Sequence, residues 1–239
     1  MAKFVIDNLR VSRGDTEIVH GVSLAIAAGE VHVVLGKNGS GKTSMVNAIM
    51  GHPAFVVTSG SVFIDGEDVT ALPPHEKARR GLFLSLQQPP EVPGVPLDDL
   101  LRTAKTALAG ERQKTAAFTV SLAENIAKLR LDPRFAERAV NVGASGGEKK
   151  RTEMVQMLTL TPKVAILDEP DSGLDQGALK YVADAILSLR KQGTSFLIVS
   201  HYQQFIDLLQ PDAIHVMREG KIVQSGGIEI LADGIAKLL

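Results

Sequence analysis

Residues 36–43, GKNGSGKT, give the strongest indication of fold in this chain. The three glycines let the backbone curl so that successive N–H groups point at phosphate oxygens. The run ends in Lys42, a cation for the β- and γ-phosphates, and Thr43, a hydroxyl for Mg²⁺. The order of Gly, four residues and then Gly-Lys-Ser/Thr therefore predicts a loop that binds a nucleoside triphosphate. The competing interpretation is an ordinary glycine turn with a surface lysine.

The flanking segments fit the phosphate-loop interpretation. VHVVL (31–35) is a short apolar run suited to a buried strand, and a helix is expected from about residue 43 to 50. The amino end of that helix adds a partial positive charge beside the phosphates. The predicted nucleotide contacts, among which Lys37 supplies a second cation, are Gly36, Lys37, Asn38, Gly39, Ser40, Gly41, Lys42, Thr43 and Ser44.

Two acids follow a second apolar run, VAILDEP (164–170). A solvated strand end is the simple interpretation of such a pair. Downstream of a phosphate loop, a second interpretation assigns chemistry to both carboxylates. Asp168 would hold Mg²⁺ through water, and Glu169 would polarise the water that attacks the γ-phosphate.

A second anion-binding helix start is predicted at ASGGEKKR (144–151). Ser145 followed by two glycines and an acid is typical of a helix amino terminus that exposes N–H groups. The simple interpretation is a Ser N-cap with Glu148 completing a capping box, and both roles can hold together.

These motifs, in this order, resemble those of the ATP-binding-cassette (ABC) ATPases over essentially the whole chain. Gln87 stands where that family has its Q-loop glutamine, a ligand of Mg²⁺, and His201 where it has its switch histidine. A histidine at a strand end is otherwise a polar cap. SGLD (172–175) resembles the family's D-loop, which places Asp175 at a dimer contact.

The resemblance implies that two cassettes pack head to tail around ATP. Each nucleotide would lie between the phosphate loop of one copy and the signature residues of the other. The homodimer would form transiently in the ATP state and reopen after hydrolysis. Catalysis would depend on Glu169, His201, Lys42 and Gln87, with Mg²⁺ at Thr43, Gln87 and Asp168; the signature residues are Ser145, Gly146 and Gly147.

The resemblance and the residue patterns imply one α/β domain over residues 1–239. Its core would be a P-loop NTPase with a RecA-like parallel sheet and an N-terminal antiparallel β subdomain, formed by residues 1–86 and 161–239. Strands alternating with helices after residue 164 favour the parallel sheet. Residues 87–160 would form an inserted helical subdomain. It would begin with the proline-rich linker QQPPEVPGVP (87–96).

Composition excludes several kinds of site. The net charge is −1, which lacks the basic footprint of a nucleic-acid binder. No apolar run reaches the length of a membrane span, and the first residues lack a secretory signal. We therefore expect a cytoplasmic protein without direct membrane insertion. There is no cysteine, so any cysteine-bound iron–sulfur cluster must belong to another chain.

Finer features resemble the SufC family, the ATPases of the SUF iron–sulfur cluster assembly system. They are SGGEKKRTEMVQML (145–158), QQPPEVPGV (87–95), DSGLD (171–175) and SHYQQFIDLLQPDAIHVMREGKIVQSG (200–226). The resemblance implies a motor that rearranges SufB/SufD-like scaffold proteins and carries no cluster itself. The nucleotide-binding subunit of a membrane transporter is the alternative, because it shares every catalytic residue. The near-zero charge argues against a DNA-associated ATPase.

Two local features depart from the family or invite a further hypothesis. Many cassettes stack adenine on an aromatic residue, yet residues 11–13 contain none, which leaves Arg13 or aliphatic contacts. We therefore expect modest ATP affinity and weak base selectivity. Lys149 and Lys150 form a solvated helix face in the simple interpretation. Alternatively, one of them pairs with an acid near Glu169 and restrains that base.

Overall fold

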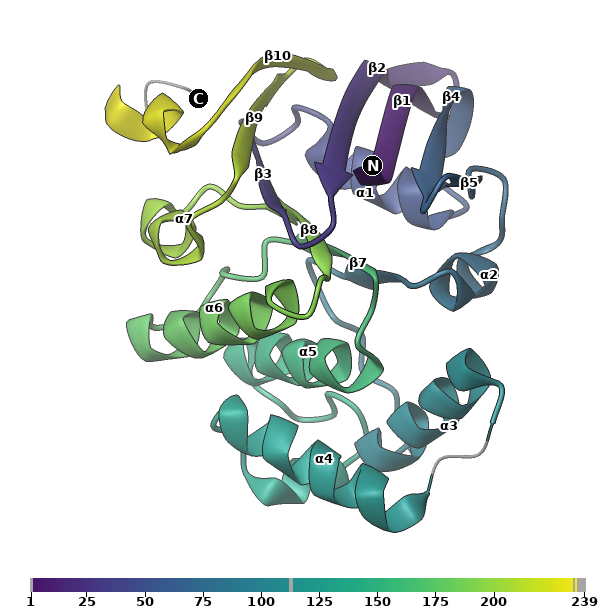
Figure 1. Ribbon diagram of the computed structural model, residues 1–239, viewed down its shortest axis with the longest axis vertical. Helices are drawn as coiled ribbons and strands as arrows, with labels where there is room; N and C mark the ends of the chain where they lie inside the picture. The colour runs from purple at the N-terminus through teal and green to yellow at the C-terminus, as the bar shows by residue number, and fades with distance from the viewer. Residues whose placement is uncertain (1, 112–113, 234, 236–239) are drawn as a thin grey trace.

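The computed structural model describes residues 2–111, 114–233 and 235, which form two β-sheets and a helical lobe (Figure 1). The first sheet is antiparallel with strand order β2-β1-β4-β5. This sheet confirms the predicted N-terminal antiparallel β subdomain, and Asp65 and Gly66 take the positive φ values, 50° and 83°, that a tight hairpin turn needs. The strands are β1 (Ala2–Arg13), β2 (Thr16–Ala27), β4 (Val56–Ile64) and β5 (Glu67–Asp68).

The second sheet has six strands in the order β10-β9-β3-β8-β7-β6. The strands from β9 to β6 pair in parallel, which confirms the predicted parallel sheet. The antiparallel edge strand β10 was not predicted. The strands are β3 (Val31–Leu35), β6 (Leu82–Ser85), β7 (Val164–Asp168), β8 (Ser195–Val199), β9 (Ala213–Arg218) and β10 (Lys221–Gly226).

The parallel sheet is buried on both faces, which explains its continuous apolar runs. Along β7, Val164 and Ile166 face one core while Ala165 and Leu167 face the other, as the two-residue period of a strand requires. The first core contains α1 (Lys42–Met50) and the antiparallel sheet. The second contains α5 (Gly146–Leu160), α6 (Gln176–Arg190) and α7 (Gln203–Leu209).

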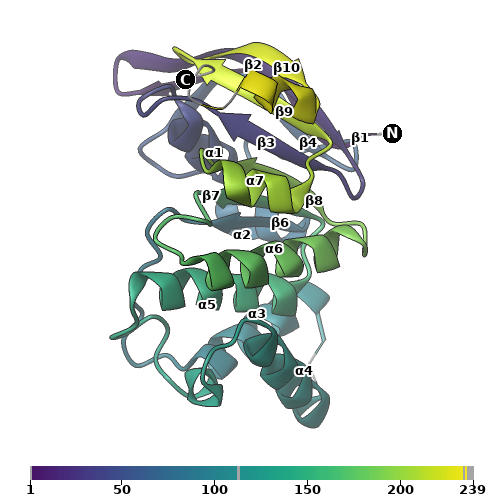
Figure 2. The ribbon, with the colours of Figure 1, turned by 90° about the vertical axis from the view of Figure 1, so that its left-hand side faces the viewer.

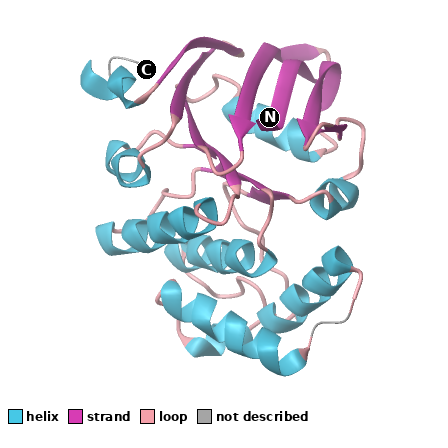
Figure 3. Ribbon diagram, viewed as in Figure 1, coloured by secondary structure: helices cyan, strands magenta, loops and turns pink. Residues whose placement is uncertain are grey.

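The helical lobe lies beyond α5 and α6, on the side of the molecule away from the antiparallel sheet (Figure 2). It contains α3 (Leu97–Ala109), α4 (Thr115–Lys128) and the 3₁₀ helix η1 (Pro133–Ala136). The expectation of helices without strands between residues 97 and 160 is confirmed for the described residues, apart from an isolated bridge between Pro96 and Ala139. The two sheets lie in the upper part of the view together with α1, α2 and α7, and the lower part is formed by helices and loops (Figure 3). The remaining helices are α2 (Pro74–Arg79) and the 3₁₀ helix η2 (Ile228–Asp233).

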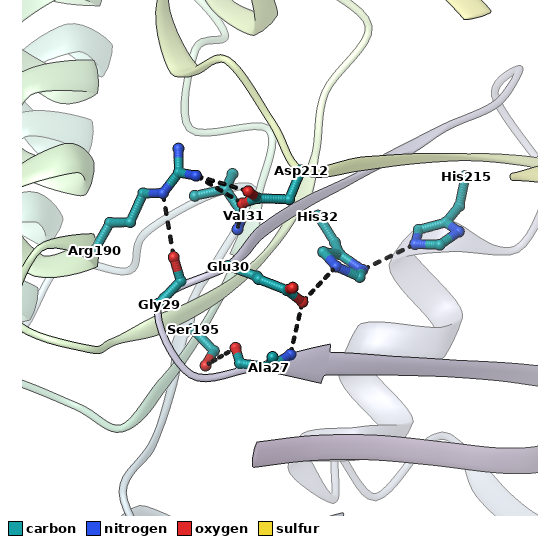
Figure 4. Close-up of polar contacts among 9 residues, drawn as sticks. All are labelled: Ala27, Gly29, Glu30, Val31, His32, Arg190, Ser195, Asp212 and His215. Atoms are coloured by element: carbon teal, nitrogen blue, oxygen red, sulfur yellow. Dashed lines mark hydrogen bonds and ion pairs between the residues drawn. The ribbon is translucent and has the colours of Figure 1, made fainter. Parts of the chain in front are cut away.

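Polar contacts fix the amino end of the parallel sheet, opposite to the phosphate loop (Figure 4). Arg190 of α6 donates to both carboxylate oxygens of Asp212, at 2.8 and 2.9 Å. Asp212 in turn accepts the N–H of Val31 at 2.8 Å. These bonds tie the start of β3 to α6, so the loop at the other end of β3 begins from a fixed strand. In the described part of the chain, no helix has the length and apolar character needed to cross a bilayer.

Candidate functional site

The phosphate loop connects β3 to α1, as predicted, and glycine is required at its start. A Cβ on Gly36 would lie 2.4 Å from the carbonyl oxygen of Met217 and 2.6 Å from Ser40 Oγ. Gly39 and Gly41 have φ values of 81° and 104°, which residues with a side chain rarely adopt. The backbone therefore has the curled form that directs N–H groups into the loop.

Lys42 places its ammonium group inside this loop. Its Nζ donates to the carbonyl oxygens of Gly36 at 2.7 Å and Lys37 at 2.9 Å. Burial lowers the pKa of Lys42, and the charges of Glu169 and Asp168 oppose that shift. A cation held between carbonyls and facing two acids is suited to a polyphosphate chain. Ser44 lies in the first turn of α1, beside Thr43.

Asp168, at the end of β7, lies beside Thr43. Burial raises the pKa of Asp168, with a smaller raising contribution from Glu169, while a hydrogen bond from the Thr43 hydroxyl lowers it. Among the described residues, its buried Oδ1 has no hydrogen-bond partner. Thr43, Gln87 and Asp168 line one cavity of about 400 Å³. Oxygen donors around an unpartnered carboxylate oxygen suit Mg²⁺, so the three predicted ligands fit that ion.

Glu169 lies between two of the other predicted catalytic groups, Gln87 and His201. Its Oε2 accepts a hydrogen bond of 2.9 Å from Gln87 Nε2, and its Oε1 lies 3.8 Å from His201 Nδ1. Its φ is 50°, a left-handed conformation that costs a non-glycine residue about 1–3 kcal/mol and that is common at functional sites. A hydrogen bond from its N–H to the carbonyl of Val199 at 2.9 Å holds this conformation.

The signature and D-loop residues form a second cluster. Ser145 caps α5, and the capping box with Glu148 is present, so the predicted N-cap role of Ser145 is confirmed. A Cβ on Gly147 would lie 3.4 Å from Leu174 Cδ2, which places the signature against the loop before α6. Gly146 has open space around it. Asp175 caps α6 by accepting the N–H of Ala178 at 2.7 Å.

The two lysines after the signature do not lie as hypothesised. Lys149 pairs with Glu91 of the proline-rich linker at 2.8 Å. Lys150 donates to main-chain carbonyls, those of Leu86 at 2.9 Å and Asp168 at 3.3 Å. The charge of Lys150 therefore supports backbone on both sides of the site instead of pairing with the Glu169 carboxylate.

Sequence reasoning missed two buried contacts that support the site. Ser200 Oγ donates to Asp171 Oδ2 at 3.0 Å and so ties the loop after Glu169 to the strand end before His201. Ser85 Oγ donates to Glu153 Oε2 at 2.7 Å, next to Gln87. The acid in DSGLD and the serine before the histidine were visible signals, but their contact depends on the tertiary fold.

Comparison with known proteins agrees with this geometry. The family model described as "ABC transporter" matches residues 19–172. The chain is 44% identical over 230 residues to "Probable ATP-dependent transporter SufC" of Escherichia coli, covering 95% of this chain and 93% of the relative. It is also 44% identical over 227 residues to "Vegetative protein 296" of Bacillus subtilis, covering 94% of this chain and 87% of the relative.

A solved structure has the same fold at low sequence identity. It is a dimeric post-hydrolysis state of the ATP-binding cassette MJ0796 bound to ADP and Pi. The TM-score is 0.82 at 21% identity, and the match covers 94% of this chain and 98% of that one.

Proposed function

Because this chain belongs to the ABC transporter family and is an ATPase, we propose that it is the motor subunit of an iron–sulfur cluster assembly scaffold. The single observation that carries this proposal is the 44% identity to the SufC protein over nearly the full length of both chains. The proposed partners are SufB/SufD-like scaffold proteins. The proposed location is the cytoplasm.

The hydrolytic roles follow from the site geometry. We assign Glu169 to polarise the attacking water, because Gln87 donates to its carboxylate and His201 Nδ1 lies 3.8 Å from it. We propose that Gln87 fixes the orientation of that carboxylate and that His201 contacts the γ-phosphate. Lys42, inside the phosphate loop, would neutralise the charge that develops on the phosphate oxygens.

Mg²⁺ would be held by Thr43, Asp168 and Gln87. The support is the unpartnered Oδ1 of Asp168 beside a hydroxyl group. When bound, Mg²⁺ supplies positive charge to the β- and γ-phosphates. All three residues line one cavity.

The second cluster supports a role in trans. Ser145 and Gly147 lie at the start of α5, next to Leu174, on one face of the parallel sheet. The phosphate loop leads into α1, which packs on the opposite face. We propose that they bind the γ-phosphate of ATP held by a second copy, with Asp175 at the contact. The MJ0796 cassette is dimeric in its post-hydrolysis state with ADP and Pi, and a dimer is what this proposal requires.

Co-purification from the native host tests the scaffold assignment. A tagged full-length chain is expected to recover soluble SufB/SufD-like proteins, and ATP with the Glu169→Gln variant is expected to change the stoichiometry of the complex. A matched pull-down with the phosphate-loop variant Lys42→Ala controls for nucleotide-independent contacts. If the tagged chain is recovered without any such scaffold protein, the assignment is wrong.

A transporter subunit is the second candidate, favoured by the name of the Escherichia coli relative, which calls it an ATP-dependent transporter. Catalysis cannot separate the two candidates, because every site residue is shared. The same pull-down from detergent-solubilised membranes does separate them. Integral membrane proteins bound through residues 87–110 would favour the transporter.

A further inference from the structure

Helix α5, called the signature helix because the signature residue Ser145 caps it, binds the main-chain N–H and carbonyl of Leu86, the residue before Gln87. Glu153 and Lys150 lie one turn apart on α5, with only 6% and 4% of their surfaces exposed. The N–H of Leu86 donates to Glu153 Oε1 at 3.1 Å, and the carbonyl of Leu86 accepts from Lys150 Nζ at 2.9 Å. One helix therefore determines where this peptide lies.

Glu153 also binds the residue before Leu86. The fully buried Ser85 donates its hydroxyl to Glu153 Oε2 at 2.7 Å. The carboxylate thus bridges two consecutive residues where β6 ends. Removing it would leave the Ser85 hydroxyl and the Leu86 N–H buried without their acceptor, so the segment would have to move to find new partners.

The segment that Glu153 holds leads directly into the hydrolytic site. Gln87 follows Leu86, and its amide donates to Glu169 Oε2 at 2.9 Å. Lys150 also donates to the carbonyl of Asp168 at 3.3 Å. The signature helix therefore contacts the backbone next to both members of the Gln87–Glu169 pair.

We infer that Glu153 is a positioning residue for ATP hydrolysis: its carboxylate fixes residues 85 and 86 so that the Gln87 amide reaches Glu169. The inference rests on the roles proposed above for Gln87 and Glu169. Because Ser145 caps α5, any shift of this helix with the signature residues also moves Glu153 and, through it, Gln87. When α5 shifts, Ser145 moves toward the ATP held by the second copy, and Gln87 moves relative to Glu169 of its own chain. One movement then completes the partner's γ-phosphate site and aligns this copy's own catalytic base.

A double-mutant cycle on the full-length ATPase tests the inference. Gln87→Ala is expected to lower kcat by up to about 100-fold, the cost of a misplaced catalytic group. Glu153→Ala is expected to lower kcat about tenfold in the wild-type background but less than about twofold when residue 87 is already alanine, since both changes break one contact. The KM for ATP stays unchanged, because Glu153 contacts residues 85 and 86 and not the phosphate loop.

Two further variants separate positioning from stability. Glu153→Gln keeps an acceptor for Leu86 and a polar partner for Ser85, so its kcat is expected to return to within about threefold of wild type. Thr159→Val removes another buried bond of α5, the one accepted from Asn125 at 3.2 Å, and is expected to lower the melting temperature while leaving kcat unchanged. If Glu153→Ala does not fold, Ser85→Ala takes its place in the cycle.

Three results would overturn the inference. The first is an equal fold-loss from Glu153→Ala in both backgrounds, which indicates a structural role only. The second is an unchanged kcat in folded Glu153→Ala. The third is an unchanged kcat in Gln87→Ala, which would also remove the role proposed for Gln87. The first two leave that role standing, so the two failures can be told apart.

Discussion

His32 and His215 share a hydrogen bond of 3.0 Å between Nδ1 of His32 and Nε2 of His215, on the adjacent strands β3 and β9 (Figure 4). The chain of contacts continues to Glu30 Oε2 at 3.2 Å on one side and to Ser225 Oγ at 2.8 Å on the other. Burial lowers the pKa of both histidines, and that of His215 falls to about 4. The pair is therefore uncharged at neutral pH.

Acid is expected to destabilise the protein through this pair. Between pH 6.5 and about 4, His215 binds a proton in the unfolded chain and not in the folded one, so the free energy of unfolding falls as the pH is lowered through this window. The full effect of a pKa depressed from 6.5 to about 4 is about 3 kcal/mol. Urea unfolding at pH 7.5, 6, 5 and 4 measures it.

The variant His215→Gln isolates that contribution. Its free energy of unfolding is expected to fall less with acid than that of the wild type, and the exposed substitution His75→Gln is the matched control. Parallel curves for wild type and His215→Gln would contradict the prediction.

Glu153 is expected to act with the opposite sign. Burial raises its pKa from 4.5 to about 7, against the lowering effects of Ser85, Leu86 and Lys150. As the pH rises from 4.5 to 7, the unfolded chain loses this proton first, so the folded state becomes less stable by up to about 3 kcal/mol. Glu153→Gln lacks this titration. Its free energy of unfolding relative to wild type is expected to improve between pH 5 and pH 8, and a constant difference would refute the assignment.

Local signals account for the parts of the fold that could be predicted. The phosphate loop depends on glycines within eight residues, and β3 and β7 are apolar runs buried on both faces. Strand β10 was missed because most of its side chains are exposed and it pairs only at the sheet edge, so it lacks a continuous apolar signal.

The contacts within the site could not be predicted, because they join distant segments. Gln87 and Glu169 are 82 residues apart, and Ser85 and Glu153 are 68 apart. A motif indicates which residue types carry the chemistry, but the hydrogen bonds depend on how α5 packs against the ends of β6 and β7. Glu153 resembles any other polar residue on the surface of a helix until that packing is known.

Lys150→Ala is expected to lower turnover. The hypothesis of a restraining ion pair predicts a higher basal rate, whereas the observed bonds to the carbonyls of Leu86 and Asp168 predict misplacement of Gln87 and Glu169. A loss of about 10- to 100-fold in kcat corresponds to the roughly 1.5–3 kcal/mol of one charge-assisted hydrogen bond. Lys149→Ala removes the exposed pair with Glu91 and is the matched control, with little change. Faster turnover in Lys150→Ala would restore the restraint hypothesis.

Nucleotide base selectivity is expected to be weak. The Arg13 guanidinium lies over the ring of Phe55, 5.7 Å from its centroid, so one of the two candidates for contacting the base, the other being aliphatic side chains, is itself held in place. An exposed cation–π contact contributes about 0.5–1 kcal/mol, less than the roughly 1–3 kcal/mol of base–aromatic stacking. ATP and GTP dissociation constants should therefore differ by less than about tenfold. Arg13→Tyr should strengthen the binding of both nucleotides; a large preference for ATP in the wild type would contradict the prediction.

Catalysis is expected to need two copies of the chain. Ser145→Arg places a guanidinium in the proposed cradle and should abolish turnover, as should Lys42→Ala. A mixture of the two variants should regain activity, because a head-to-tail heterodimer has one site with both an intact Lys42 and an intact Ser145. Glu169→Gln should lower turnover by about 10²–10⁴-fold, the usual contribution of a catalytic base, and accumulate an ATP-bound dimer on size exclusion. Undiminished turnover by Ser145→Arg, or a mixture as inactive as its components, would show that each chain acts alone.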